Sequence, residues 1–151
     1  MKLLIILISS FFYSGFFPFA SGTFATLCFL PFYYFIFREM SPVLYFSITV
    51  GIYFIGVWAS SYAAVIFKDK DPHKVVIDEV VGYLITMLFI PFTIKRMLVG
   101  FVIARVFDII KPWPAYQSQK LRAGNGIMMD DAIAGVYGNL VMWSLIFLGI
   151  I

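Results

Sequence analysis

The chain has few charged residues, one cysteine and one histidine. Charged residues make up 13% of its 151 residues, against about 25% in a typical soluble domain, and no polar stretch is long enough to form a large soluble domain. The single cysteine, Cys28, excludes a disulfide within the chain, and a zinc site would need several more Cys or His ligands. No stripe of lysine and arginine interleaved with aromatics is present, so we expect no binding to nucleic acid.

Apolar residues are abundant instead. They make up 62% of the chain and aromatic residues 20%, whereas a soluble domain is about 45–50% apolar. This composition is typical of a membrane protein, because aromatic rings suit positions that face lipid or lie at its interfaces. The length predicts a single domain over residues 1–151.

Five apolar stretches predict helices that cross the bilayer, for which about 17–25 residues are needed. They run over residues 22–37, 43–67, 75–92, 97–110 and 132–151. The shortest, residues 97–110, should continue toward Trp113 and end within the Lys-Pro-Trp-Pro segment that follows it, since proline cannot continue a helix without losing a hydrogen bond. We therefore predict an all-α fold, a polytopic membrane helical bundle of about five spanning helices.

The N-terminal apolar stretch, residues 3–17, is short and broken by Gly15 and Pro18. We expect a short interfacial or re-entrant helix there, with a full span as the alternative. Residues 1–10 resemble a signal peptide, but no convincing small-x-small cleavage site follows them, so we expect the segment to be retained.

The basic residues in the loops predict the orientation of the chain in the membrane. If residues 22–37 run outward, six basic residues lie on the cytoplasmic side and three on the other, which the positive-inside rule favours. The six are Lys68, Lys70, Lys74, Lys111, Lys120 and Arg122, and the three are Arg38, Lys95 and Arg96.

Seven of the eight acidic residues fall at or near one membrane face in this topology. They are Asp69, Asp71, Asp78, Glu79, Asp108, Asp130 and Asp131. Several lie inside or against apolar runs, where a carboxylate costs on the order of 2.5–3.5 kcal/mol at the bilayer centre and less near the interface. Such carboxylates are usually paired or bind cations, and Mg²⁺ prefers oxygen ligands. Three acidic clusters from three helix ends therefore predict a site for one or two Mg²⁺ ions.

Simpler interpretations stay open for some of these residues. Asp69 and Asp71 are flanked by lysines and can be solvated loop residues. Arg105 and Lys111 each lie three residues from Asp108, so either can form a purely structural ion pair with it on one helix face.

Two glycine-containing segments precede apolar helices. Gly22 and Thr23 begin the first stretch, and a helix N-terminus has free N–H groups and a positive dipole end that suit a phosphate; alternatively, Thr23 is an ordinary N-cap. The second segment, residues 124–126, reads Gly-Asn-Gly and allows a tight turn. This turn is either an ordinary loop or a place where backbone approaches a ligand.

Four segments, in chain order, resemble a known family. They are Pro18–Thr23, Val76–Gly82, Arg105–Pro114 and Gly126–Gly135. They carry an Asp-Glu pair, an Asp-x-x-Lys-Pro-Trp-Pro sequence and an Asp-Asp pair, and together they look like phosphatidylglycerophosphatase A over about residues 15–135. Ser21 stands where the family commonly has proline before Gly-Thr.

This resemblance implies a multi-pass enzyme of the bacterial inner (cytoplasmic) membrane with its active site on the cytoplasmic side. It would hydrolyse phosphatidylglycerophosphate to phosphatidylglycerol and phosphate, with Mg²⁺ as cofactor and the bilayer and a phospholipid substrate as its partners. The expected metal ligands are Asp78, Glu79, Asp108, Asp130 and Asp131, and all of these except Asp130 are the expected catalytic residues. The expected phosphate-binding residues are Gly22, Thr23, Lys74, Arg105 and Lys111.

Other functional classes fit the sequence less well. An ion or proton transporter also uses membrane carboxylates, but here the acids gather at one face and are not spread through the depth. Membrane phosphatases that use two histidines are excluded because the chain has only His73, and the Asp-Gly-x-x-Ala-Arg signature of CDP-alcohol transferases is absent. The attacking group in a phosphatase could be water or a carboxylate, and the sequence leaves both open.

Overall fold

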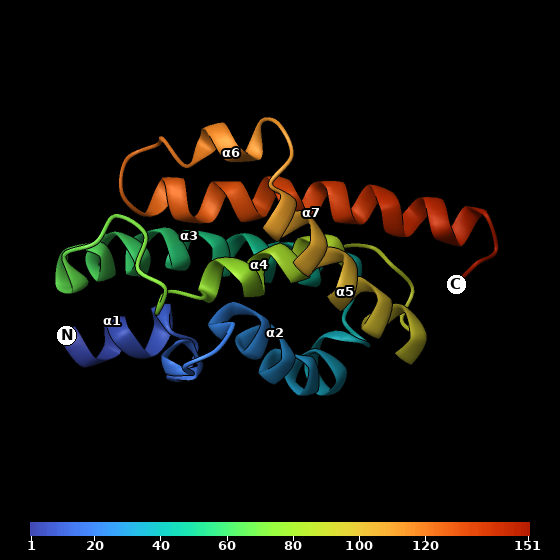
Figure 1. Cartoon of the computed structure of the whole chain (residues 1–151). Helices are drawn as coiled ribbons and strands as arrows, with labels where there is room; N and C mark the ends of the chain where they lie inside the picture. Colours follow the sequence, from blue (N-terminus) through green and yellow to red (C-terminus); the bar gives the residue numbers. More distant parts are fainter.

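The structure, a computed structural model, describes all 151 residues, and every regular element is helical (Figure 1). The all-α prediction is confirmed. The α-helices are α1 (Lys2–Ser9), α2 (Ser21–Phe32), α3 (Pro42–Phe67), α4 (Ile77–Thr86), α5 (Ile94–Ile110), α6 (Ala115–Ser118) and α7 (Gly124–Phe147). A 3₁₀ turn, η1 (Ser14–Phe16), precedes α2, and a π-helical segment, η2 (Tyr33–Phe37), continues it.

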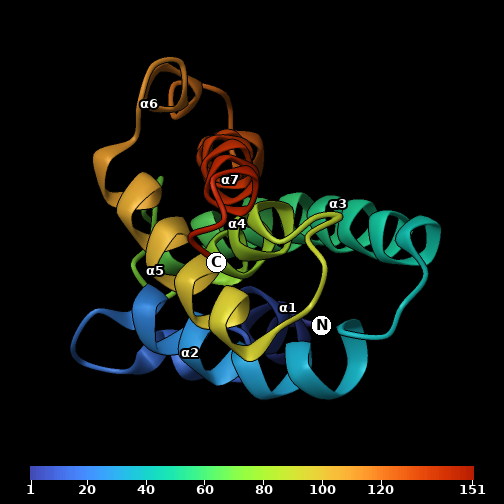
Figure 2. The same ribbon diagram turned by 90° about the vertical axis from the view of Figure 1, so that its right-hand side faces the viewer.

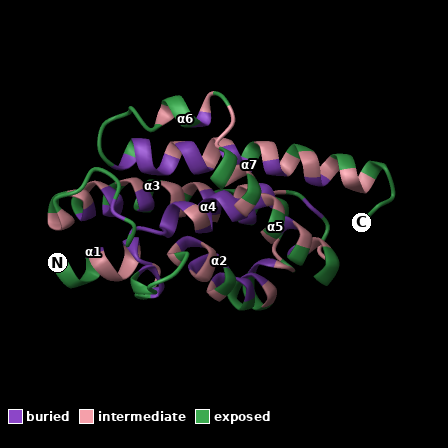
Figure 3. Cartoon of the chain, in the orientation of Figure 1, coloured by how far each residue is buried: buried purple, intermediate pink, exposed green.

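The short helix α4 lies at the centre of the molecule. It contacts α2, α3, α5 and α7, and the view in Figure 2 shows α7 above it, α3 and α5 on either side and α2 below. Eight of its ten residues are buried. The purple of Figure 3 runs along α4 and the N-terminal half of α7, so the core lies between these two helices.

Small residues let α4 and α7 approach closely. A Cβ added to Gly135 of α7 would lie 2.6 Å from the carbonyl oxygen of Gly82, and one added to Gly138 would lie 2.7 Å from Oγ1 of Thr86. Neither position can hold a larger side chain without moving backbone or core, which is the reason small residues recur where helices pack tightly. This close contact brings Asp131, one turn before Gly135, against the first turns of α4.

Helix α4 is shorter than the apolar stretch that contains it. Ten residues extend about 15 Å, roughly half of the hydrocarbon core of a bilayer, so the prediction of one helix over residues 75–92 is wrong. The amide of Asn139 in α7 explains how the chain can leave the helix early. It donates to the carbonyl oxygens of Thr86 (3.0 Å) and Leu88 (2.8 Å), which would otherwise be unsatisfied at the helix end.

One helix, α3, is long and apolar enough to cross a membrane. Its start is well defined, because Pro42 occupies the first turn and the Ser41 hydroxyl accepts a hydrogen bond from the Leu44 amide (3.4 Å). The residues from Ser21 to Phe37 form a shorter apolar helical segment, and α1 has only eight residues. Five spanning helices are therefore not confirmed, whereas a short N-terminal helix is present as predicted.

The Lys-Pro-Trp-Pro segment ends α5 as predicted, although the helix does not continue toward Trp113. The helix stops at Ile110, and its C-cap residue Lys111 adopts a left-handed conformation (φ 45°) directly before Pro112. This turn matters for the site, because it directs the Lys111 side chain back toward the acidic residues of α5 and α7.

Candidate metal centre and active site

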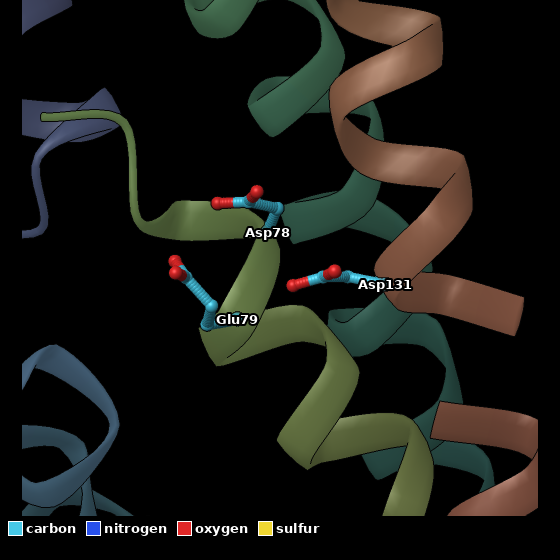
Figure 4. A group of neighbouring side chains, drawn as sticks. All are labelled: Asp78, Glu79 and Asp131. Atoms are coloured by element: carbon cyan, nitrogen blue, oxygen red, sulfur yellow. The ribbon is translucent and has the colours of Figure 1, made fainter. Parts of the chain in front are cut away.

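Three carboxylates from two helices meet at the core of the molecule. Asp78 and Glu79 lie in the first turn of α4, and Asp131 reaches toward them from α7 (Figure 4). One carboxylate oxygen from each lies within 4.8 Å of the others. The close packing of Gly82 against Asp131 sets this separation, since the Gly82 position would bring a Cβ to 3.1 Å from the Asp131 carbonyl oxygen.

Most of the oxygens in this cluster have no hydrogen-bond partner. Oδ1 of Asp78, Oε2 of Glu79 and both carboxylate oxygens of Asp131 are buried and unpartnered. Two ionised carboxylates separated by 4.8 Å repel each other by roughly 3.5 kcal/mol at an effective dielectric constant of about 20. Buried oxygens that repel each other and lack partners form a donor set that fits a hard divalent cation such as Mg²⁺.

Two basic side chains border the cluster. Arg105 of α5 lies 2.8 Å from Oδ2 of Asp108 and 3.8 Å from Oε1 of Glu79. Lys111 lies 3.7 Å from Asp108 and 3.6 Å from Oδ1 of Asp131. The structure contains the ion pair between Arg105 and Asp108 that their three-residue spacing allows. Arg105 and Lys111 together hold Asp108 next to the cluster.

Lys111 keeps its charge in this position. Burial alone would lower the pKa of its ammonium group, but the negative charges of Asp131, Asp130 and Asp108 outweigh that effect and raise the pKa above its ordinary value. Together Arg105 and Lys111 supply two positive charges among five carboxylates, so the protein's own charges do not neutralise the site.

Asp130 lies beside the cluster and has its own partners. Its Oδ2 is hydrogen-bonded to Lys111 and accepts a hydrogen bond from the side-chain amide of Gln119 (2.8 Å). Its Oδ1 accepts a hydrogen bond from the backbone amide of Asp131 (3.0 Å). Both oxygens are thus engaged, which distinguishes Asp130 from Asp131, and its place among the metal ligands stays a prediction.

The start of α2 packs directly on Glu79. A Cβ added to Gly22 would lie 1.8 Å from Oε1 of Glu79, so any larger residue here would displace the Glu79 carboxylate. Ala20 is the N-cap residue of α2, and the interpretation of Thr23 as an N-cap is therefore wrong. Thr23 lies within the first turn, half-buried, and its hydroxyl makes no hydrogen bond to the protein.

A cavity of about 260 Å³ reaches two members of the cluster, Asp78 and Glu79. The polar residues that line it are Ser21, Asp71, His73, Asp78, Glu79, Asp108 and Lys111. The Ser21 hydroxyl donates a hydrogen bond to the carbonyl oxygen of His73 (2.8 Å) and so ties the start of α2 to the loop before α4. A phosphate group that enters this cavity meets Asp78 and Glu79, Lys111 and the N-terminal end of α2 together.

The structure does not bring Lys74 to the carboxylates. Its ammonium group lies over the rings of Phe16 (5.0 Å) and Phe67 (5.1 Å), in a cation–π arrangement. It lines a neighbouring cavity with Gly15 and not the cavity that reaches the cluster. The phosphate-binding role expected for Lys74 has no support in this position.

Comparison with known proteins identifies the family. The sequence profile of phosphatidylglycerophosphatase A matches residues 7–146. The chain belongs to the phosphatidylglycerophosphatase A family. Two relatives that bear this family's name are the Escherichia coli protein, 33% identical over 82% of this chain and 72% of the relative, and the Haemophilus influenzae protein, 39% identical over 50% of this chain and 47% of the relative.

A Bacteroides thetaiotaomicron protein with the provisional name phosphatidylinositol-3-phosphatase is 33% identical over 91% of this chain and 90% of its own length. No solved structure matches the chain. The family and its named members establish that the protein is a phosphatase, and they do not favour the transporter alternative.

The four segments that resemble the family converge on the carboxylate cluster. Pro18–Thr23 leads into the first turn of α2 against Glu79, and Val76–Gly82 contains Asp78 and Glu79 themselves. Arg105–Pro114 supplies the two cations and Asp108, and Gly126–Gly135 supplies Asp130 and Asp131. Sequence reasoning missed Gln119, which bonds Asp130, because nothing in the polar loop pattern marks one amide among several.

Proposed function

We propose that this phosphatase hydrolyses phosphatidylglycerophosphate to phosphatidylglycerol and inorganic phosphate in a Mg²⁺-dependent reaction. The observation that carries the proposal is the group of buried, unpartnered carboxylate oxygens on Asp78, Glu79 and Asp131. The names of the Escherichia coli and Haemophilus influenzae relatives support this lipid as the substrate.

Asp78, Glu79 and Asp131 would hold the cation, with Asp108 at the edge of the same cavity. A divalent cation bound there supplies positive charge that offsets the phosphoryl oxygens and the leaving alkoxide. The carboxylates alone would repel a phosphate dianion, so the same residues that create the cation site also make the reaction depend on the cation.

Lys111 and Arg105 would bind and orient the phosphoryl group. Lys111 lines the cavity and remains protonated, and charge-assisted hydrogen bonds from lysine and arginine to phosphate are among the stronger polar contacts in proteins. Their pairs with Asp108 hold both side chains in place before substrate enters. The two cations therefore have a positioning role as well as an electrostatic one.

The first turn of α2 would complete the phosphate site. Its N–H groups have no intrahelical partners and point toward the N-terminal end of the helix. Gly22 leaves room for Glu79 at this end, and the Thr23 hydroxyl, free of protein hydrogen bonds, is available to a phosphate oxygen.

The chain would lie in the bacterial cytoplasmic membrane and cross it more than once, with the active site on the cytoplasmic side. Large apolar side chains cover its outer surface, such as Phe35 (78% exposed), Val65 (74%) and Phe147 (84%), and a bilayer would shield them from water. The short helix α4 is compatible with membrane depth because its irregular ends are buried among other helices.

The test is release of inorganic phosphate by the purified protein from three lipids: phosphatidylglycerophosphate, phosphatidic acid and phosphatidylinositol 3-phosphate. The proposal expects the highest kcat/KM for phosphatidylglycerophosphate. A clear preference for phosphatidylinositol 3-phosphate would instead indicate the substrate for which the Bacteroides thetaiotaomicron relative is named. No phosphate release from any of the three would reject the proposed activity.

A further inference from the structure

A second cavity, of about 460 Å³, lies next to the one that Asp78 and Glu79 line. Asp71 lines both cavities. The ion pair between Lys111 and Asp130 lies between them, since Lys111 lines the first cavity and Asp130 the second. A molecule bound at the carboxylates can therefore extend past this ion pair into the second cavity.

The second cavity is lined by basic side chains that have no acidic partner. Lys70, Lys120 and Arg122 all face it, and none of them lies in an ion pair with a carboxylate. Of the two acids that also line the cavity, Asp130 is already bound by Lys111 and Gln119. The unneutralised charge of the cavity is therefore positive, in contrast to the first cavity.

Backbone geometry adds to this positive character. The first turn of α7 forms one wall of the cavity through Gly126, and the N-terminal end of a helix carries a partial positive charge. Gly126 also lets the loop pack tightly, because a Cβ there would lie 2.7 Å from the carbonyl oxygen of Leu121. The loop that carries Lys120 and Arg122 is thereby held on the start of α7.

Apolar side chains lie beside these cations. Leu121 lines the cavity and is 49% exposed, and Trp113 and Tyr116 of the same connection between α5 and α7 are also exposed. Tryptophan and tyrosine are typical of the membrane–water interface. Cationic groups next to apolar ones match a lipid where its acyl region joins an anionic phosphodiester.

We propose that this second cavity binds the phosphodiester of the substrate lipid through Lys70, Lys120 and Arg122. The inference rests on the proposed function, in which the phosphomonoester lies at the carboxylate cluster. A lipid that carries both a phosphomonoester and a phosphodiester then occupies both cavities, whereas phosphatidic acid, with a single phosphate, occupies only the first. The three cations therefore determine which lipid phosphates the enzyme prefers.

The experiment compares wild type with the double variant Lys120→Ala/Arg122→Ala. The control, Lys2→Ala/Lys95→Ala, removes the same charge from exposed residues that line neither cavity. Each protein is assayed in neutral detergent, where the substrate is the sole lipid with a phosphodiester. The first readout is kcat/KM for phosphatidylglycerophosphate and for phosphatidic acid, and the second is the Kd for dioctanoyl phosphatidylglycerol, which carries the phosphodiester alone.

The proposal expects the double variant to lose at least tenfold in kcat/KM for phosphatidylglycerophosphate, mainly through KM, and less than twofold for phosphatidic acid. Its Kd for dioctanoyl phosphatidylglycerol should rise at least tenfold, and the control should match wild type in both readouts. Equal losses on the two substrates, or an unchanged Kd, would overturn it. If wild type hydrolyses neither lipid, the proposed function fails, while the Kd comparison still decides whether the cavity binds a phosphodiester.

Discussion

Asp131→Asn is the substitution that most sharply separates a metal centre from a structural cluster. It removes one negative charge and keeps the shape of the side chain, which is 1% exposed and has both oxygens unpartnered. If the cluster holds a cation, the variant loses a ligand. We expect kcat/KM for phosphatidylglycerophosphate to fall at least a hundredfold, which corresponds to about 2.7 kcal/mol of transition-state stabilisation.

The same substitution should stabilise the metal-free protein. Asp131 lies within 4.8 Å of both Asp78 and Glu79, and two repulsions at that distance amount to roughly 7 kcal/mol at an effective dielectric constant of about 20. The attraction between Asp131 and Lys111 at 3.6 Å offsets roughly 4.6 kcal/mol of this repulsion at the same effective dielectric constant. The balance, about 2 kcal/mol in favour of removing the charge, holds when all three carboxylates are ionised. It is an upper value, because neighbouring carboxyls this close relieve part of their repulsion by binding a proton.

Thermal unfolding in detergent measures this balance directly. In excess chelator, Asp131→Asn should unfold a few degrees above wild type, and in excess Mg²⁺ the order should reverse, because only wild type gains from the cation. Glu39→Gln is the control, since Glu39 is exposed and pairs only with Arg38. Two results would contradict a cation site at Asp131. One is an unfolding temperature of Asp131→Asn below that of wild type in chelator, and the other is an equal rise of both unfolding temperatures with Mg²⁺.

Three further predictions concern the cation, the start of α2 and the topology. Chelation should abolish phosphate release, Mg²⁺ should restore it, and Ca²⁺, which is larger and less strict in its geometry, should restore it poorly; full activity after exhaustive chelation would contradict this. Gly22→Ala should inactivate the enzyme because the added Cβ would overlap the Glu79 carboxylate. Thr23→Ala should lower kcat/KM per folded molecule more than tenfold and leave thermal stability unchanged. If Thr23→Ala instead lowers thermal stability and leaves kcat/KM intact, Thr23 has only a structural role. Cysteines introduced at Lys70 and Lys120 should resist an impermeant external reagent in sealed cells, and labelling of both would reverse the proposed topology.

The gathering of Asp78, Glu79 and Asp131 could be anticipated from the sequence, because carboxylates in apolar runs conflict with their surroundings. Carboxylates inside apolar runs, such as Asp78 and Asp131, are costly unless they meet a cation, so their positions alone indicate a site. The end of α5 could also be predicted, because Pro112 acts locally on the backbone. Both the carboxylates in apolar runs and the end of α5 are determined by residues within a few positions in the sequence.

The length of α4 could not be predicted for the opposite reason. Hydropathy over residues 75–92 counts apolar side chains, but the helix ends where Asn139, 53 residues after Thr86, takes the Thr86 carbonyl oxygen. The position of Lys74 depends in the same way on rings from η1 and α3. The end of α4 and the position of the Lys74 side chain both depend on residues that are distant in sequence. The residues next to them in the chain therefore do not predict either feature.

The most direct test of the central claim is phosphate release from phosphatidylglycerophosphate during a Mg²⁺ titration of wild type and Asp78→Asn. Asp78 is buried in the first turn of α4 with one oxygen unpartnered, and the change to asparagine alters charge without altering size. We expect wild type to show no release without metal and a saturable rise with Mg²⁺, and Asp78→Asn to show little release at any concentration. Release by wild type in the absence of divalent metal, or the same Mg²⁺ curve for both proteins, would contradict a metal centre built on these carboxylates.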